Sequence, residues 1–133
     1  MNELSILKNK KKKYKHAYVY IALSENGLVK IGRSVDPYKR LKTLQNTTGH
    51  IFTKIFLTDL IFNFSKIENQ MHRYFKDFKK QGEWFEIKFE VAVKKIKQLD
   101  FIILSDEKAE KEQKNHSRQL NNFFNSLLNT NLK

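Results

Sequence analysis

Five short groups of residues could together build a catalytic site, because each adds a different reactive side chain. In chain order they are Tyr18-Val19-Tyr20, Lys30-Ile31-Gly32-Arg33-Ser34, Arg40, Glu68 with His72, and Gly82-Glu83-Trp84-Phe85. A phenol or an amine can accept a proton, a guanidinium can bind two oxygens of one phosphate, and a carboxylate can hold a hard cation. Phosphodiester cleavage needs these three roles: a deprotonated attacking oxygen, neutralised nonbridging oxygens and a stabilised leaving oxygen.

Other kinds of chemistry find little support in the sequence. The four histidines (His16, His50, His72 and His116) are dispersed, and no two form an HxH or HxxxH pair, so a His-rich zinc site is disfavoured. The absence of cysteine removes disulfides and thiolate metal sites. There is no GxGxxG, P-loop or nucleophile-elbow spacing, which disfavours nucleotide cofactors and acyl transfer.

Taken together, the five groups resemble the GIY-YIG nuclease superfamily, and specifically the branch common in phages and large viruses whose second motif reads Lys-Ile-Gly. The resemblance extends from about Tyr18 to Ile87. It implies an endonuclease that hydrolyses phosphodiester bonds in DNA with one divalent ion, Mg²⁺ or Mn²⁺, held by Glu68. The implied catalytic residues are Tyr20, Lys30, Arg40 and Glu68. Tyr18, Arg33 and His72 are expected to bind phosphate or to support these residues.

The identity of the base stays open at this stage. Tyr20 could accept the proton if Lys30 and the metal lower the pKa of its phenol, and Lys30 itself could do so if Arg33 and Arg40 make it less basic. We favour Tyr20, with Lys30 assisting. Glu68 also has a structural interpretation, because Ser65 three residues earlier would complete a helix capping box with it.

The turn between the first two expected strands decides whether Tyr20 and Lys30 can meet. A two-residue turn at Asn26-Gly27 would put them on opposite faces of the hairpin. A three-residue loop over residues 25–27, with Gly27 left-handed, pairs Ala22 with Lys30 and makes Tyr20 and Lys30 diagonal neighbours. We predict the three-residue loop.

The patterning predicts an α/β (α+β) fold with a small, mainly antiparallel, three-stranded sheet flanked by helices. Expected strands cover residues 17–23, 28–32 and 50–61, the last of them central, with a brief strand near 83–87. Expected helices cover 36–48, 63–80 and 91–103, and a last helix begins after Ser105-Asp106-Glu107. We divide the chain into a flexible basic arm (1–15), a GIY-YIG-like domain (16–103) and a C-terminal helical extension (104–133).

The net charge of +12 favours a polyanionic partner. We expect nucleic acid, DNA in preference to RNA, contacted in part by the arm residues Lys10, Lys11, Lys12 and Lys13. An A+T-rich genome would explain the many lysines equally simply. No apolar run is long enough for a membrane span and no secretory signal is evident, so we expect an intracellular, cytoplasmic protein, or a nuclear one in a eukaryotic host.

Two other functions remain open. The chain could be a nucleic-acid-binding module of the same fold that has lost catalytic activity. Lys30 is the feature that suggests this alternative. It could also be an interaction adaptor, because the C-terminal helix either packs back on the domain or meets a second copy or another protein.

Overall fold

The computed structural model describes the backbone of residues 15–131 and the side chains of residues 15–126, so Lys10 to Lys13 of the predicted arm lie outside the described residues. The elements are β1 (Tyr18–Ser24), β2 (Val29–Ser34), α2 (Pro37–Thr48), β3 (Phe52–Leu57), α3 (Phe64–Tyr74), a 3-10 turn (Lys76–Phe78), β4 (Lys79–Gln81), β5 (Trp84–Phe85), α4 (Phe89–Ile96) and α5 (Glu107–Asn131). The predicted α+β class is confirmed, with five antiparallel strands rather than three.

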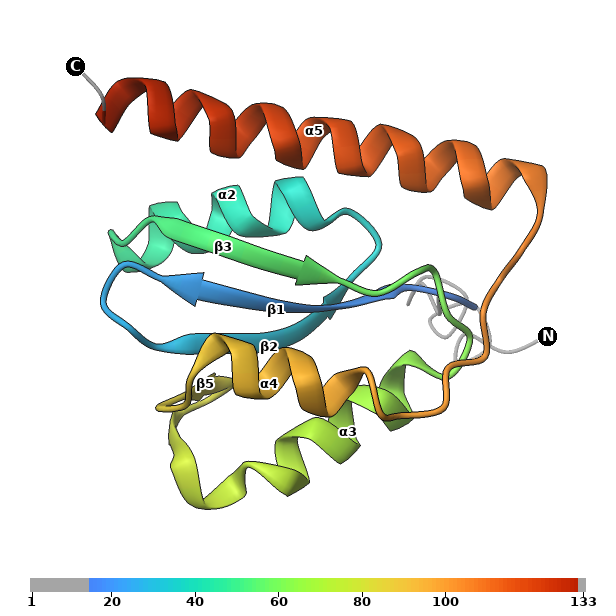
Figure 1. The fold of residues 1–133 in the computed structure, drawn as a ribbon, viewed down its shortest axis with the longest axis horizontal. Coiled ribbons are helices and arrows are strands. Elements are labelled where there is room, and N and C mark those ends of the chain that lie inside the picture. Colours follow the sequence, from blue (N-terminus) through green and yellow to red (C-terminus); the bar gives the residue numbers. More distant parts are fainter. Residues whose placement is uncertain (1–14, 132–133) are drawn as a thin grey trace, which may run out of the picture.

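The sheet has the order β3-β1-β2-β5-β4, and helices cover both of its faces. Alternate residues of β1 point to opposite sides, as a strand requires. Val19 and Ile21 enter a core with α3 and α4, whereas Tyr20 and Ala22 enter a core with α2 and α5. Figure 1 shows this layering, with α5 and α2 above the strands and α3 and α4 below.

The hairpin between β1 and β2 has the predicted three-residue loop. The amide of Gly27 donates to the carbonyl of Ser24 at 2.9 Å, and the amide of Ser24 donates to the carbonyl of Leu28 at 2.9 Å. Gly27 has φ of 88°, a conformation that favours glycine. Ala22 therefore pairs with Lys30, and Tyr20 pairs with Gly32, so the predicted register is confirmed.

The first helix, α2, begins and ends where the sequence predicts. The carboxylate of Asp36 accepts from the amide of Lys39 at 3.2 Å, Pro37 is the first helical residue, and Gly49 closes the helix with φ of 78°. Leu41 and Leu44 are buried against the sheet. The helix thereby holds Arg40 on its exposed side, close to the end of β2.

The predicted central position of the third strand is wrong. β3 pairs only with β1 and forms an edge of the sheet, whereas β1 is an interior strand with both faces covered. The apolar residues on both faces of β3 are real, since Ile55 and Leu57 pack on one core and Phe56 on the other. A strand with both faces covered has the same apolar sequence pattern whether it lies inside the sheet or at its edge, which explains the error.

Two predicted helices are too long. α3 ends at Tyr74 and is followed by the 3-10 turn and β4, because Phe75 completes the buried stripe whereas Phe78 is 53% exposed. Gln81-Gly82 does not end a helix, because Gln81 is the last residue of β4 and Gly82 lies in the turn between β4 and β5. α4 ends at Ile96 rather than at Ile103, which forms an isolated bridge with Ile61.

The last helix, α5, packs back on its own domain. The side chain of Asp106 accepts from the amide of Ala109 at 2.7 Å and caps the helix, as predicted. Ala109 and Leu120 are buried, and the hydroxyl of Tyr18 lies 2.8 Å from Nδ1 of His116. Within the described part of the chain, no helix combines the length and apolarity that crossing a membrane requires.

Candidate active site

The candidate site lies at the outer edge of β2, at the point where its pairing with β5 ends. β5 pairs with β2 only at Val29 and Lys30, and the last hydrogen bond runs from the amide of Ile31 to the carbonyl of Glu83 at 3.2 Å. No described strand continues along this edge from Gly32 to Ser34. α3 lies alongside instead, and side chains from four elements can therefore meet here.

Tyr20 contributes a buried phenol that lies against the backbone of β2. The residue is 1% exposed, and its hydroxyl has no hydrogen-bond partner among the described residues. A Cβ atom at Gly32 would lie 2.6 Å from the Tyr20 hydroxyl oxygen and 2.7 Å from Cζ. Only glycine at position 32 leaves room for this phenol.

The electrostatics of the phenol differ from the prediction. Burial raises the pKa of Tyr20 to about 12, an effect that the nearby guanidinium of Arg40 reduces and that Glu83 and Glu68 reinforce. Arg40, rather than Lys30, is therefore the cation that acts on this hydroxyl.

Lys30 is held by a carboxylate that sequence reasoning had given no role. Its Nζ lies 3.1 Å from Oε1 of Glu83 and 5.4 Å from the ring centre of Trp84. Lys30 is 6% exposed, and a buried ammonium needs such a partner. Trp84 itself stacks on Phe52, in line with its predicted packing role.

Glu68 is a buried carboxyl on α3 that faces the edge of β2. Its Oε1 lies 3.7 Å from Nε of Arg33. Nη1 of the same guanidinium donates a hydrogen bond to the hydroxyl of Ser65. The predicted capping box is therefore wrong, because Asn63 rather than Ser65 is the residue before the first turn of α3, and Ser65 binds Arg33. Burial, and then the neighbouring Glu83, raise the pKa of Glu68 to about 7, while Arg33 and Lys30 lower it in part.

His72, one turn after Glu68, is fixed by the backbone of β2. Its Nε2 lies 2.8 Å from the carbonyl oxygen of Ile31, and its ring packs edge-on against Phe85. Because a carbonyl only accepts, Nε2 carries a proton, and Nδ1 is the nitrogen that has the lone pair in the neutral form of the ring.

Glu68, His72 and Glu83 form a group that could hold a metal ion. One ligand atom from each residue lies within 4.8 Å of the other two. Carboxylate oxygens and an imidazole nitrogen are ligands for divalent cations, so these residues fit the metal that the resemblance implies. The sequence showed Glu83 within a motif but gave no sign of its role, because its place here depends on the pairing of β5 with β2.

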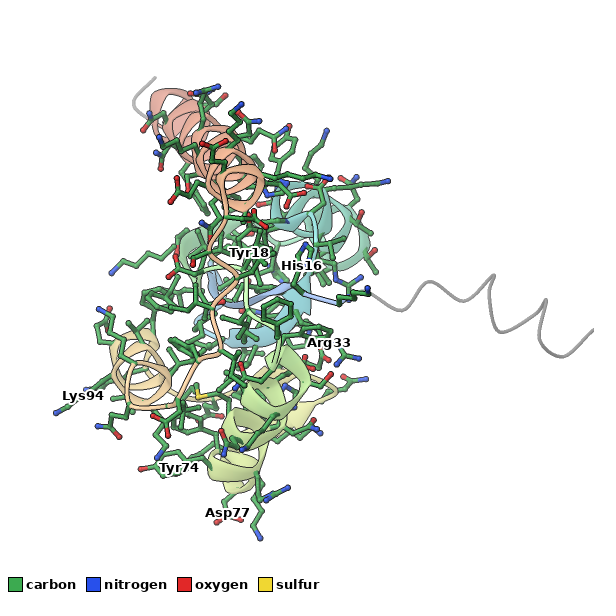
Figure 2. All side chains as sticks on the ribbon, turned by 90° about the vertical axis from the view of Figure 1, so that its right-hand side faces the viewer. His16, Tyr18, Arg33, Tyr74, Asp77 and Lys94 are labelled. Atoms are coloured by element: carbon green, nitrogen blue, oxygen red, sulfur yellow. The ribbon has the colours of Figure 1, made fainter. Side chains whose placement is uncertain are left out.

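The structure brings six of the seven predicted site residues to this edge and places the seventh elsewhere. Tyr18 lies two residues before Tyr20 on the same face, but its hydroxyl contacts His116 of α5. Burial, and then the carboxylates of Glu112 and Asp59, raise its pKa. Figure 2 shows Arg33 between α2 and α3, on the side of the molecule away from α4. The six residues at the site are Tyr20, Lys30, Arg33, Arg40, Glu68 and His72.

The fold and the site define a small α+β domain that sets a phenol, basic groups and a potential metal ligand set at one sheet edge. The T5orf172 domain matches residues 15–100, so the chain belongs to the T5orf172 domain family. This domain is found in phage and nuclease-like proteins, which agrees with the resemblance to a phage-type nuclease at that general level. No curated protein and no solved structure matches the chain.

We predict that Gly32→Ala lowers the free energy of unfolding by about 1–3 kcal/mol, because the added methyl displaces the Tyr20 ring. In a Tyr20→Ala background the same substitution should cost little, since the ring it meets is gone. Urea denaturation of the four proteins measures both costs. An equal cost in the two backgrounds contradicts the close contact between Tyr20 and Gly32.

We also predict that ionisation of Glu68 destabilises the metal-free protein. Its pKa of about 7 exceeds the ordinary value of 4.5, so its stabilising contribution is complete below about pH 4.5 and is lost as the pH rises through about 7. Glu68→Gln should therefore melt close to the wild-type temperature at pH 5 and above it at pH 8.

Glu86→Gln is the matched control, because Glu86 is exposed and paired with Lys80 at 2.9 Å. Its melting temperature should differ from wild type by the same amount at both pH values. A Glu68→Gln difference that does not change with pH overturns the prediction.

Proposed function

We propose that this chain is a divalent-metal-dependent endonuclease that hydrolyses phosphodiester bonds in DNA. The observation that carries the proposal is the convergence of Tyr20, Lys30, Arg40 and Glu68 at the unpaired edge of β2. Membership of a family found in nuclease-like proteins supports it.

Arg33 and Arg40 supply positive charge for the phosphate group. Both side chains are exposed, so DNA can reach them, and a guanidinium can donate two parallel hydrogen bonds to phosphate oxygens. Arg33 is held in place by Glu68 and Ser65, whereas Arg40 lies beside the Tyr20 phenol. A phosphate bound by both arginines would lie next to that phenol.

Glu68 would hold one Mg²⁺ or Mn²⁺ ion, which when bound supplies a Lewis acid for the leaving oxygen. Its raised pKa means that the carboxyl is partly protonated near neutral pH without a cation. Ionisation and metal binding therefore favour each other at this residue.

Tyr20 is the better placed of the two candidate bases. The Lys30 ammonium already donates to Glu83, whereas the Tyr20 hydroxyl has no partner among the described residues. In the proposed step the phenolate takes a proton from water, the water oxygen bonds to phosphorus, and the bond from phosphorus to the leaving oxygen breaks. That oxygen then takes a proton from solvent. Because the pKa of Tyr20 is about 12, the phenolate fraction rises with pH throughout the neutral range.

The charge of the chain supports DNA as the partner. The net charge is +12, and neutralising phosphates releases condensed counterions, which favours association at low salt. The lysines of residues 10–13 would add affinity without sequence preference.

We predict that Arg40→Ala and Glu68→Ala each lower the rate of plasmid cleavage in Mg²⁺ at least about 100-fold, because each removes charge stabilisation at the reacting phosphate. Arg40 is exposed, and the smaller alanine at position 68 removes a buried charge, so circular dichroism should show folded protein. Nicking of supercoiled plasmid, with and without EDTA, measures the effect.

Arg73→Ala and Glu86→Ala are the matched controls, since both residues are exposed and lie outside the site. Their rates should stay within about twofold of wild type. Full activity of Glu68→Ala removes its metal role. DNA binding by the wild type without cleavage identifies a binding module instead.

A further inference from the structure

We propose that Glu83 and His72 bind the metal directly together with Glu68, and that this mixed ligand set selects Mn²⁺ over Mg²⁺. The inference rests on the proposed function for the presence of a metal at Glu68. It adds two ligands and a metal preference that neither the sequence pattern nor the family implies.

Glu83 is anchored by its backbone and reachable from solvent. Its carbonyl accepts from the amide of Ile31 at 3.2 Å, which fixes the residue at the end of the β2–β5 pairing. Its side chain is 38% exposed, against 10% for Glu68. The pair therefore offers one carboxylate from the interior and one from the surface, with room for waters on the outer side.

Two ion pairs explain how the carboxylates stay close without a cation between them. Lys30 contacts Oε1 of Glu83, and Arg33 contacts Oε1 of Glu68. The two carboxyl groups also contact each other. A carboxylate has two oxygens with several lone pairs, so each group retains lone pairs for a metal. The ligand set is thus prearranged rather than assembled by the ion.

The hydrogen bond of His72 prepares its ring for metal binding. Donation from Nε2 to the carbonyl of Ile31 fixes the neutral tautomer that leaves a lone pair on the other nitrogen. Metal-binding histidines commonly make such a bond to a backbone carbonyl or carboxylate, which holds the ring and strengthens the ligand.

The Tyr20 hydroxyl, which lies beside Arg40, is a second and independent observation at this place. It is a polar atom in a residue that is 1% exposed, and it has no hydrogen-bond partner among the described residues. Both Glu68 and Glu83 act on its pKa, which places the hydroxyl near the two carboxylates. A water ordered between the hydroxyl and an ion would satisfy it.

The nitrogen ligand decides the metal preference. Mg²⁺ prefers an all-oxygen octahedral shell and keeps several waters, whereas Mn²⁺ accepts carboxylates and binds imidazole more readily. A ligand set of two carboxylates and one histidine should therefore bind Mn²⁺ more tightly than Mg²⁺. The preference should depend on His72, and the affinity for either ion should depend on Glu83.

Metal binding to the full chain without DNA tests the inference. Calorimetry gives affinities for Mn²⁺ and Mg²⁺, and the EPR signal of free Mn²⁺ gives an independent value. We expect Glu83→Gln to weaken Mn²⁺ binding about tenfold or more. His72→Gln should weaken Mn²⁺ about tenfold and Mg²⁺ much less, so the preference shrinks.

Each variant has a matched control elsewhere on the surface. Glu86→Gln changes an exposed carboxylate three residues along the chain, and His50→Gln changes an imidazole that lies 3.4 Å from the carboxylate of Glu25. Both should bind Mn²⁺ within about twofold of wild type. If Glu83→Gln misfolds because Lys30 loses its partner, the double variant Lys30→Met with Glu83→Gln removes both charges and should show the same loss. Lys30→Met alone should retain Mn²⁺.

Wild-type Mn²⁺ affinity in the Glu83→Gln proteins overturns the inference, and so does an unchanged metal preference in His72→Gln. The proposed function fails separately. A wild-type protein that binds Mn²⁺ through Glu83 but does not cleave DNA keeps the inference and loses the nuclease activity. A protein that cleaves DNA but binds the metal without Glu83 keeps the proposed nuclease activity and overturns the inference.

Discussion

The register between β1 and β2 is the constraint on which the candidate site depends. Gly27 closes a three-residue loop, and the loop pairs Tyr20 with Gly32 and Ala22 with Lys30. A shift of one residue would move Lys30 to the opposite face of the sheet and put a side chain where the Tyr20 ring now lies. Because that ring fills the space over Gly32, the hairpin turn and the position of the phenol are determined together.

Because β5 ends early, the edge of β2 beyond Lys30 is accessible to side chains from other elements. A longer β5 would pair with Gly32 and the residues after it, and would cover the edge that Glu68 and His72 approach from α3. The two-residue strand instead stops at Lys30 and leaves Glu83 at the corner. Two carboxylates, three cations and a buried phenol then share this place. Burial is the main cause of the raised pKa values of Tyr20 and Glu68, and the neighbouring carboxylates add to it.

Local signals made part of this arrangement predictable from the sequence. Asp36-Pro37 and Gly49 bound α2, and the Glu25-Asn26-Gly27 loop gave the register, because caps and turns act over a few residues. The edge position of β3, the end of α3 at Tyr74 and the Ser65–Arg33 hydrogen bond were missed, since each depends on which elements become neighbours. Glu83 is the clearest case: it was visible within a motif, but its role required knowing that β5 pairs beside Lys30.

Anomalous diffraction from a crystal soaked in Mn²⁺ tests most directly whether a metal ion binds at Glu68, beside the edge of β2. The account predicts one strong peak within about 2.5 Å of a Glu68 carboxylate oxygen, on the side that faces Tyr20. A Mn²⁺ peak bound only at other carboxylates, or no peak at Glu68 at saturating Mn²⁺, would contradict it.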